Sequence, residues 1–519
     1  MCGILFTNKI INDLLDIIKF LKNRGPDYTN NVKIQEYSFV HVLLSMTGNN
    51  FTIQPFTYKN DSIVILFNGE IYNYKDFGDF NSDGECIIEA YYKYKEDFIK
   101  YLDGEFAILL MDFEKNKLYF SSDIFCIKPL WYSIEENYIG ISSYKSCLEK
   151  LNFKNITEMP FNTTIVVDIS NNFEIIKKIS VYDFDLKQFK TSFDDWNNAF
   201  EKSIIKRTQN KKHKIFIGLS SGYDSGLIAA VLKKLNINYK AYTIEGSENK
   251  EIIDKRNLIH DNYEIINIST ENFVKQKNYL KNMCEDYNLF IDNDELKNLN
   301  FWINEKNTFE QNNNNLKCEE YTKILNKIIA YQLLYEKALN KKIYEDNGAI
   351  GLGIICEKAR PNNELIYLTG SGADEITSDY GWNGIKHYRH STIGGYFPEN
   401  LTKVFPWKNF FENTQKAYLR KEEYIAGTYG IEGRYPFLDK NVVQEFLWLS
   451  NDLKNKWYKA PIYNYLKTNN YPFDENKKVG FNCGMSDGSK NNINNKIASR
   501  VQIGMTDDET LKIDISKFK

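Results

Sequence analysis

The sequence predicts at least two domains, the second of which has an α/β fold around a doubly wound, mostly parallel sheet. An apolar strand at 215–219 runs through a tight polar turn into an apolar helix at 227–232. Further apolar strands at 239–244, 264–268 and 365–368 alternate with helical stretches. A chain of 519 residues is also long enough for about two to four domains.

Net charge, apolar runs and cysteine usage indicate which binding partners and which cellular compartment to expect. A net charge of −3 gives no reason to expect nucleic acid or an acidic membrane. No apolar run is long enough to cross a bilayer, and the N-terminus lacks the features of a signal peptide. The eight cysteines include no CxxC pair, which is typical of thiols in a reducing cytoplasm. We therefore expect a cytoplasmic protein with no nucleic-acid or membrane partner, and leave a homodimer open.

The N-terminal half begins with a cysteine directly after Met1. Removal of Met1 would give Cys2 a free α-amine beside its thiol, so that one residue holds both a nucleophile and a general base. A chance Met-Cys start is the alternative. Apolar residues then recur at helical spacing between Ile10 and Leu21, which predicts a helix with a stripe in the core.

Three further motifs in this half carry polar groups at the ends of apolar elements. A buried strand at 63–67 leads into Asn68-Gly69-Glu70, where an amide and a backbone N–H could hold an oxyanion. Asp83, at the head of an apolar helix, could bind an ammonium group. Arg24-Gly25-Pro26-Asp27 is a turn by composition, and each motif taken alone also fits an ordinary turn or cap. A hairpin at 162–181 closes the half, which predicts domains at 2–183 and 194–519.

The polar turn after the 215–219 strand predicts a phosphate site. A strand that turns sharply into a helix leaves backbone N–H groups free, and these attract phosphate. Ser220, Ser221 and Ser225 add hydroxyl donors. Asp224 is an acid among these donors, which fits a Mg²⁺ ion between it and the phosphates. A Walker-type loop does not fit, because the Gly-Lys-Ser/Thr pattern is missing, and an ordinary Ser-rich turn is the alternative.

A second turn, at 369–375, follows the 365–368 strand and ends in two acids. Asp374 could anchor the same Mg²⁺ opposite Asp224. A helix N-terminus capped by acids is an equally good interpretation of the turn alone. The polar, low-complexity segment 306–321 is expected to be a surface excursion.

Together the N-terminal motifs resemble the glutaminase domain of class II glutamine amidotransferases. Ser220–Ser225 resembles the Ser-Gly-Gly-x-Asp-Ser loop of ATP pyrophosphatases, with Ser221 in place of the first glycine. The segments 369–375 and 430–439 resemble further motifs of glutamine-hydrolysing asparagine synthetases. The resemblance covers nearly the whole chain. It implies an α+β N-terminal nucleophile (Ntn) hydrolase sandwich followed by an α/β doubly wound parallel-sheet ATP-pyrophosphatase domain.

The resemblance also implies a role for each motif residue. Cys2 would attack the side-chain amide of glutamine, with Asn68 and Gly69 as the oxyanion hole. The residues expected to bind glutamine are Arg24, Asn68, Glu70 and Asp83. Those expected to bind ATP are Leu219, Ser220, Ser221, Gly222, Asp224, Ser225, Thr243, Gly370 and Lys478. Mg²⁺ would bind Asp224 and Asp374, and the acceptor carboxylate would lie among Ser371, Asp374, Glu375 and Arg434.

Three positions depart from the family pattern. Leu43 stands where the family has an arginine that binds the glutamine carboxylate, Ser122 where it has an arginine, and Ser371 where it has a glutamate. A serine cannot act as a base near neutral pH, so the acceptor pocket has changed. Aspartate is the expected acceptor, and another carboxylate such as a sugar acid, a peptide or a secondary metabolite is the alternative. A β-lactam-forming cyclase and a non-catalytic binding module are the remaining options.

Overall fold

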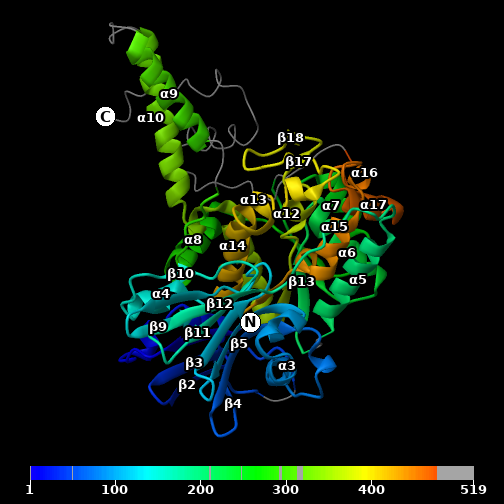
Figure 1. The fold of residues 1–519 in the computed structure, drawn as a ribbon. Helices are drawn as coiled ribbons and strands as arrows, with labels where there is room; N and C mark the ends of the chain where they lie inside the picture. Colours follow the sequence, from blue (N-terminus) through cyan, green and yellow to red (C-terminus); the bar gives the residue numbers. More distant parts are fainter. Residues whose placement is uncertain are drawn as a thin grey trace.

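The computed structural model describes two packed domains joined by an extended segment, with the N-terminal strands below the parallel sheet in the view of Figure 1. The residues that it describes are 2–48, 51–209, 212–246, 248–291, 295–312 and 319–475. Of the helices in these ranges, none combines the length and apolar character needed to span a bilayer.

The N-terminal domain is a sandwich of two antiparallel sheets. In the central strands, alternate residues such as Ile4, Val64 and Leu109 face the layer between the sheets, and residues between them are buried on the other face. These strands therefore consist mainly of apolar residues, whereas the edge strands β2 and β12 are polar and largely exposed or half-buried. One sheet has the order β10-β8-β9-β1-β3-β2, formed by Thr157–Glu158, Trp131–Glu135, Tyr138–Ser142, Gly3–Thr7, Tyr37–Leu43 and Tyr28–Ile34. The other has the order β12-β11-β7-β6-β5-β4, formed by Glu174–Ser180, Thr163–Asp168, Lys117–Ser122, Gly104–Asp112, Ile63–Ile71 and Phe56–Tyr58.

The helices of this domain are short: α1 Leu14–Ile17, α2 Leu21–Arg24, α3 Cys86–Tyr94 and α4 Lys145–Lys150. The single helix predicted over 10–21 is wrong. Asp13 caps a new helix by accepting a hydrogen bond from the Asp16 N–H, so the segment before it stays non-helical. Ile10 and Leu15 are accordingly 81% and 65% exposed, whereas Ile18 and Leu21 are buried as predicted.

The second domain contains the predicted parallel sheet, in the order β15-β14-β13-β16-β19. The chain leaves β13 towards one edge and then crosses back to β16, so that β13 and β16 flank the switch point where ligands bind in such sheets. Their carboxyl ends carry the two predicted turns. The strands are Tyr263–Ile266, Lys240–Ile244, Lys214–Gly218, Glu364–Leu368 and Glu432–Arg434.

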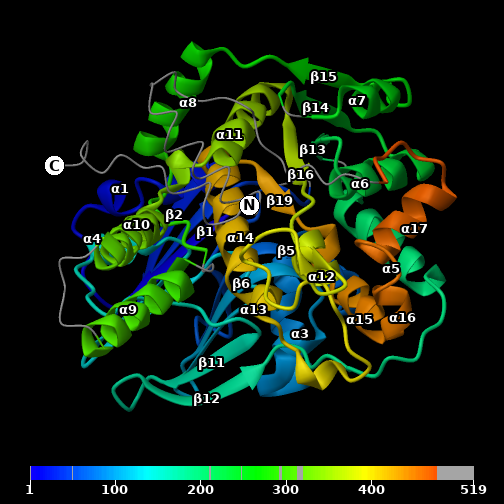
Figure 2. The ribbon, with the colours of Figure 1, turned by 90° about the horizontal axis from the view of Figure 1, so that it is seen from above.

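Helices cover both faces of this sheet, with α5, α6 and α17 on one side and α8, α11 and α14 on the other (Figure 2). A two-stranded ribbon, β17 Gly381–Trp382 with β18 Ile385–Lys386, lies near α12. The helices α5 to α8 are Asp194–Thr208, Tyr223–Lys234, Lys250–Asn257 and Thr270–Met283. Helices α11 to α17 are Asn347–Ala359, Ala373–Thr377, Lys408–Phe411, Thr414–Thr428, Lys440–Trp448, Asn451–Lys454 and Ala460–Thr468.

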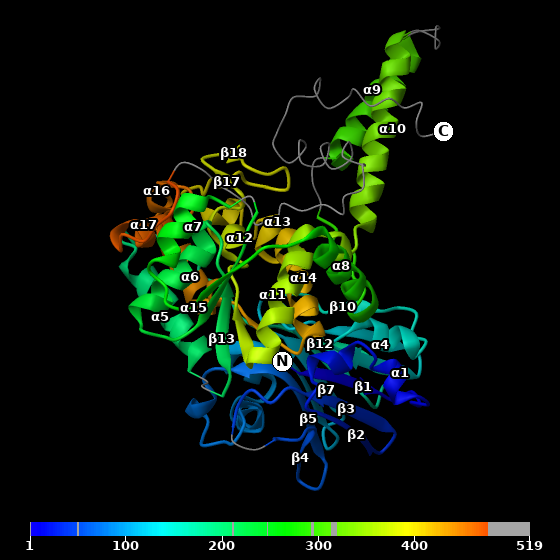
Figure 3. The same ribbon diagram turned by 180° about the vertical axis from the view of Figure 1, so that it is seen from behind.

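The predicted surface excursion is a helical hairpin. Helices α9 (Glu295–Asn312) and α10 (Glu319–Asn340) pack against each other and project from the body of the molecule (Figure 3). The polar segment 306–321 thus includes the end of α9 and the start of α10, and its residues 313–318 lie outside the described residues.

Buried ion pairs join the two domains. Glu423 on α14 contacts Arg24 at 3.0 Å and Lys128 at 2.9 Å, and all three side chains are inaccessible to solvent. Arg434 on β19 contacts Glu70 of β5 at 3.1 Å. Side chains of the second domain therefore reach the N-terminal end of the first, where Cys2 lies.

Candidate active sites

Cys2 directly precedes β1, and its N–H, carbonyl oxygen and Sγ each contact another residue. Its N–H donates to Asn68 Oδ1 at 2.9 Å, its carbonyl accepts from Arg24 Nε at 2.9 Å, and its Sγ lies 3.7 Å from the Leu44 carbonyl oxygen. Burial raises the pKa of the Cys2 thiol to about 11. The thiol is therefore neutral near pH 7, and nucleophilic attack needs a base close by.

Asn68 and Gly69 form a donor group beside this thiol. The Asn68 side chain is buried, and its Nδ2 has no hydrogen-bond partner within the described part of the chain. Gly69 has a φ of +140°, and a Cβ there would lie 2.0 Å from the Glu105 carbonyl oxygen. An unsatisfied buried donor is costly, and this one fits an oxygen that becomes negatively charged during reaction.

The pocket in front of Cys2 is acidic. Asp83 opens the 3₁₀ turn Asp83–Glu85 and accepts from the Ile71 N–H at 2.7 Å and from Thr47 Oγ1 at 3.1 Å. Burial raises its pKa to about 6. The residues that line the pocket are Cys2, Leu43, Leu44, Ser45, Met46, Thr47, Thr52, Gln54, Phe67, Gly69, Glu70, Ser82, Asp83 and Glu432. Three carboxylates in one pocket suit an ammonium group.

Two of these observations differ from expectation. Arg24, expected to touch glutamine, is fully buried behind Cys2 and is not among the lining residues. Glu432 belongs to the 430–439 motif, but the sequence did not predict its place here, where it lines the pocket from β19 of the other domain. A single sequence carries no signal for a contact between residues so far apart.

The phosphate loop follows β13 as predicted, and α6 starts directly after it with Gly222 as its N-cap. Ser220 Oγ accepts from the Gly222 N–H at 3.1 Å, and Ser225 Oγ accepts from the Ser220 N–H at 3.0 Å. The Leu219 carbonyl accepts from Thr243 Oγ1 at 2.8 Å, so these two expected residues hold the base of the loop.

An acidic side chain accepts hydrogen bonds from Ser221 of this loop. Glu248 Oε2 accepts from the Ser221 N–H at 2.6 Å and from Ser221 Oγ at 2.5 Å. Sequence reasoning missed Glu248, which comes from the loop after β14. The Ser221 N–H and hydroxyl thus both donate to one negatively charged group, as they would have to in a phosphate site.

Asp224 and Asp374 come together around one cation. Lys459 Nζ lies 2.6 Å from Asp224 Oδ1 and 2.9 Å from Asp374 Oδ2. Burial alone would lower the pKa of Lys459, but the two carboxylates raise it, so the side chain is charged. A Cβ at Gly370 would lie 2.8 Å from Asp224 Cβ, so glycine allows the two turns to approach this closely.

This pair of carboxylates fits the predicted Mg²⁺. In the described ranges, no group of three or more His, Cys, Asp or Glu side chains could hold a metal. Mg²⁺ is usually held by one or two carboxylates together with substrate phosphates, which is the arrangement of Asp224 and Asp374 beside the loop. Lys478 lies outside the described residues.

The predicted acceptor residues are only partly together. The Ser371 N–H donates to Thr369 Oγ1 at 3.1 Å, and Thr369 Oγ1 donates to Glu422 of α14 at 2.6 Å. Burial raises the pKa of the Glu422 carboxyl group, and the nearby Thr369 and Ser371 hydroxyls oppose this rise. Glu422 thus places an acid beside Ser371 that the sequence did not reveal.

The other two expected acceptor residues point elsewhere. Glu375 is buried, accepts from the Gly372 N–H at 3.2 Å and from the Tyr380 hydroxyl, and has its pKa raised to about 7 by burial. The Arg434 guanidinium lies beside Glu70 and Glu432, on the side of the Cys2 pocket.

Two comparisons with known proteins bear on the two domains. The glutamine amidotransferase domain family matches residues 1–181. A glutamine-hydrolysing asparagine synthetase of Methanocaldococcus jannaschii is 26% identical over 480 residues, 83% of this chain and 76% of the relative. This similarity extends over both domains of the chain. Another relative with this name, from Acanthamoeba polyphaga mimivirus, is 23% identical over 85% of this chain and 77% of its own length.

Asparagine synthetase B of Escherichia coli is 28% identical over 255 residues, 46% of this chain and 44% of the relative. The comparison with solved structures found glutamine phosphoribosylpyrophosphate amidotransferase from B. subtilis, with 13% identity over 42% of this chain and 60% of that chain. Its TM-score of 0.28 is too low to indicate a shared overall fold.

Residues 1–181, which match the glutamine amidotransferase domain family, include Cys2. The α/β domain that follows contains the phosphate loop. Over most of its length the chain is similar to proteins named as glutamine-hydrolysing asparagine synthetases.

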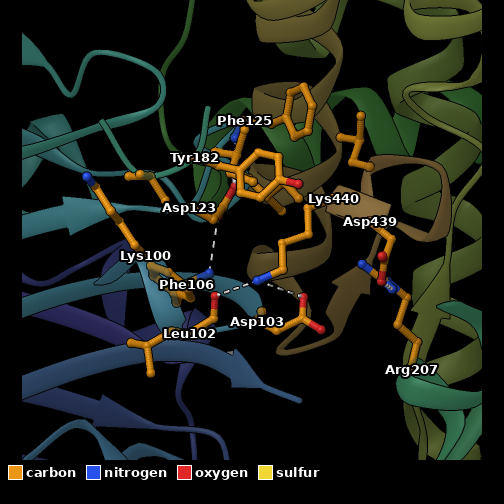
Figure 4. Close-up of a pocket in the computed structure, with 15 residues that line it drawn as sticks. Lys100, Leu102, Asp103, Phe106, Asp123, Phe125, Tyr182, Arg207, Asp439 and Lys440 are labelled. Carbon is orange, nitrogen blue, oxygen red and sulfur yellow. Dashed lines mark hydrogen bonds and ion pairs between the residues drawn. The ribbon is translucent and has the colours of Figure 1, made fainter. Parts of the chain in front are cut away.

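A second cleft lies between the domains and contains none of the predicted site residues (Figure 4). Lys440 donates to the Leu102 carbonyl at 3.2 Å and lies 3.9 Å from Asp103. Arg207 contacts Asp439 at 3.0 Å. Lys440 and Arg207 are thus paired with carboxylate or carbonyl groups from the other domain or from their own. We therefore interpret this cleft as part of the interface between the domains.

Proposed function

We propose that this chain converts a carboxylate to an amide, using ammonia from glutamine and activation by ATP, with aspartate as the first candidate acceptor. The observation that carries the proposal is the convergence of Asp224 and Asp374 on one cation beside an anion-binding loop. This arrangement suits ATP with a divalent ion, and it lies in the same chain as a cysteine in an acidic pocket.

In the first domain Cys2 would act as nucleophile. Its Sγ bonds to the side-chain carbonyl carbon of glutamine, and its proton passes to the α-amine that removal of Met1 leaves on Cys2. Asn68 Nδ2 and the Gly69 N–H stabilise the oxyanion. The carbon–nitrogen bond breaks, the proton leaves with ammonia, and water hydrolyses the thioester to glutamate.

In the second domain the acceptor carboxylate oxygen would bond to the α-phosphorus of ATP while the bond to pyrophosphate breaks. Ser220, Ser221 and Ser225 donate hydrogen bonds to the pyrophosphate. Asp224 and Asp374 would hold Mg²⁺, which would offset the phosphate charge. Glu248 and Lys459 give up their present contacts as ATP enters, since both occupy polar groups that ATP and its ion need.

Ammonia then attacks the acyl carbon and AMP leaves. It has to reach the adenylate inside the protein, because ammonia released to water near pH 7 becomes ammonium, which has no free electron pair. The ion pairs of Glu423 with Arg24 and of Arg434 with Glu70 hold the two domains against each other.

The acceptor pocket supports a second candidate substrate. Ser371 is uncharged, and the acid beside it is Glu422 on a different element. A carboxylate moved to another wall of the pocket would suit an acceptor of different shape, such as a sugar acid, a peptide or a secondary metabolite.

The test is pyrophosphate release from ATP and Mg²⁺, with glutamine as nitrogen donor and aspartate as acceptor. Release that requires both substrates, with asparagine formed in step, supports asparagine synthesis. Glutamate formed without aspartate-dependent pyrophosphate shows that the acceptor is different, and ATP–pyrophosphate exchange across a panel of carboxylic acids then identifies its class. No exchange with any acid would contradict the proposal.

A further inference from the structure

The charges of the Cys2 pocket match only one end of a free amino acid. Glutamine carries an α-ammonium and an α-carboxylate, and both must be desolvated to bind. Glu70, Asp83 and Glu432 line the pocket, but no Lys, Arg or His does so among the described residues. Leu43 contributes only apolar surface. A carboxylate held in such a pocket without a cation would lose binding free energy.

The two arginines closest to the pocket are already paired. Arg24 donates to the Cys2 carbonyl and to Glu423, and its side chain is inaccessible to solvent. Arg434 contacts Glu432 at 2.7 Å and Glu70 at 3.1 Å. Releasing either arginine to a ligand would leave a buried carboxylate without its cation, which is strongly unfavourable.

A lysine of the synthetase domain reaches the rim of the pocket. Lys212 Nζ lies 2.5 Å from the hydroxyl of Ser45, which lines the pocket. Lys212 is exposed, and its ammonium lies 6.0 Å from the centroid of the Phe51 ring. The ammonium thus lies beside a residue that lines the pocket, on the exposed side of that residue.

The position of Ser45 is itself fixed from both domains. The Ser45 N–H donates to Asp27 Oδ2 at 2.8 Å, and His213 Nε2 lies 2.7 Å from the Ser45 carbonyl oxygen. Lys212 and His213 directly precede β13, so the strand that carries the phosphate loop also holds them in place. Lys212 and His213 of the second domain therefore both contact Ser45, a residue of the first domain that lines the pocket.

We propose that Lys212 binds the α-carboxylate of glutamine, so that the glutaminase pocket is completed by a cation from the synthetase domain. The inference rests on the proposed role of the Cys2 pocket in binding glutamine. The acids hold the ammonium on one wall, and the lysine holds the carboxylate at the mouth. Glutamine is then oriented with its side-chain amide towards Cys2 Sγ and Asn68 Nδ2.

The test compares glutamine with 4-aminobutanamide, which is glutamine without its carboxylate. Steady-state glutamate release by the full chain gives KM for glutamine, and competition gives the inhibition constant of 4-aminobutanamide. In Lys212→Ala we expect KM for glutamine to rise about 10-fold, the size of a charge-assisted hydrogen bond near solvent, with little change in kcat. The inhibition constant of 4-aminobutanamide stays unchanged, because this ligand has no carboxylate.

Two further variants separate binding from folding. Lys212→Arg keeps the charge and should keep KM within about threefold of wild type. Lys214→Ala removes an exposed lysine two positions along the same segment and should leave both constants unchanged.

An unchanged KM in Lys212→Ala, or an equal rise in both constants, would overturn the inference while leaving Cys2 as the nucleophile. Wild-type protein that releases no glutamate at all would overturn the proposed glutaminase site and the inference together.

Discussion

The most sensitive single position of the domain interface is Glu423. Its carboxylate accepts from Arg24 at 3.0 Å, from Lys128 at 2.9 Å and from the Tyr435 hydroxyl at 3.2 Å. Glu423→Gln keeps the shape and removes the charge, which leaves two fully buried cations without their shared partner.

The expected loss in free energy of unfolding is about 3–5 kcal/mol, the cost of breaking a buried ion pair by removing one partner. The loss is not doubled for two cations, because Lys128 keeps the Gly433 carbonyl at 2.8 Å and Glu105 at 3.9 Å. Arg24 likewise keeps its hydrogen bond to the Cys2 carbonyl.

Urea unfolding followed by both fluorescence and circular dichroism measures this loss, and two probes are needed because two domains can unfold separately. The matched control is Glu149→Gln, which removes the same charge from an exposed pair with Lys145 and should change stability by less than about 1 kcal/mol. If Glu423→Gln lost no more than this control, the buried pairs would not hold the domains together and the reasoning would be refuted.

Three further predictions concern the two sites. Cys2→Ala should abolish glutamine-dependent amide formation and keep ammonia-dependent formation, since only the nucleophile is lost; equal loss of both, measured as amide product, contradicts a two-site mechanism. Burial raises the pKa of Asp83 to about 6, so acidification through pH 6 neutralises the carboxylate and KM for glutamine should rise; Asp83→Asn should have a high KM that does not change over this range, and a pH-dependent KM in that variant would assign the titration to another group. Glu248→Gln should lower KM for ATP about two- to tenfold, because the neutral side chain competes less with phosphate for Ser221; an increased KM would show that Glu248 assists ATP binding.

The sequence correctly predicted those elements that are specified by residues close together in the chain. The β13 strand, the turn at Ser220 and the following helix form one continuous pattern, and the structure confirms the parallel sheet around them. The helix expected near Ile10 failed because a single cap, Asp13, decides where a short helix begins. Periodicity alone does not register such a cap.

The groups that complete the sites were not predictable in this way. Glu432, Glu248, Glu422 and Lys459 come from segments far from the motifs they serve. Only the packing of helices and strands brings them within hydrogen-bonding distance. Glu248, Glu422 and Lys459 belong to no motif identified in the sequence. Glu432 belongs to the 430–439 motif, but nothing in that motif predicts its contact with the Cys2 pocket.

The short strand β19 limits how this protein can be divided or recombined. Its first residue, Glu432, lines the Cys2 pocket, and the carbonyl of its last residue, Arg434, accepts from the Thr369 N–H at the turn that carries Ser371. An isolated fragment 2–183 would lack one wall of its own pocket and would expose Arg24 and Lys128. The amidotransferase half is therefore not an interchangeable module, and a chimera with another synthetase half would have to bring its own equivalent of β19.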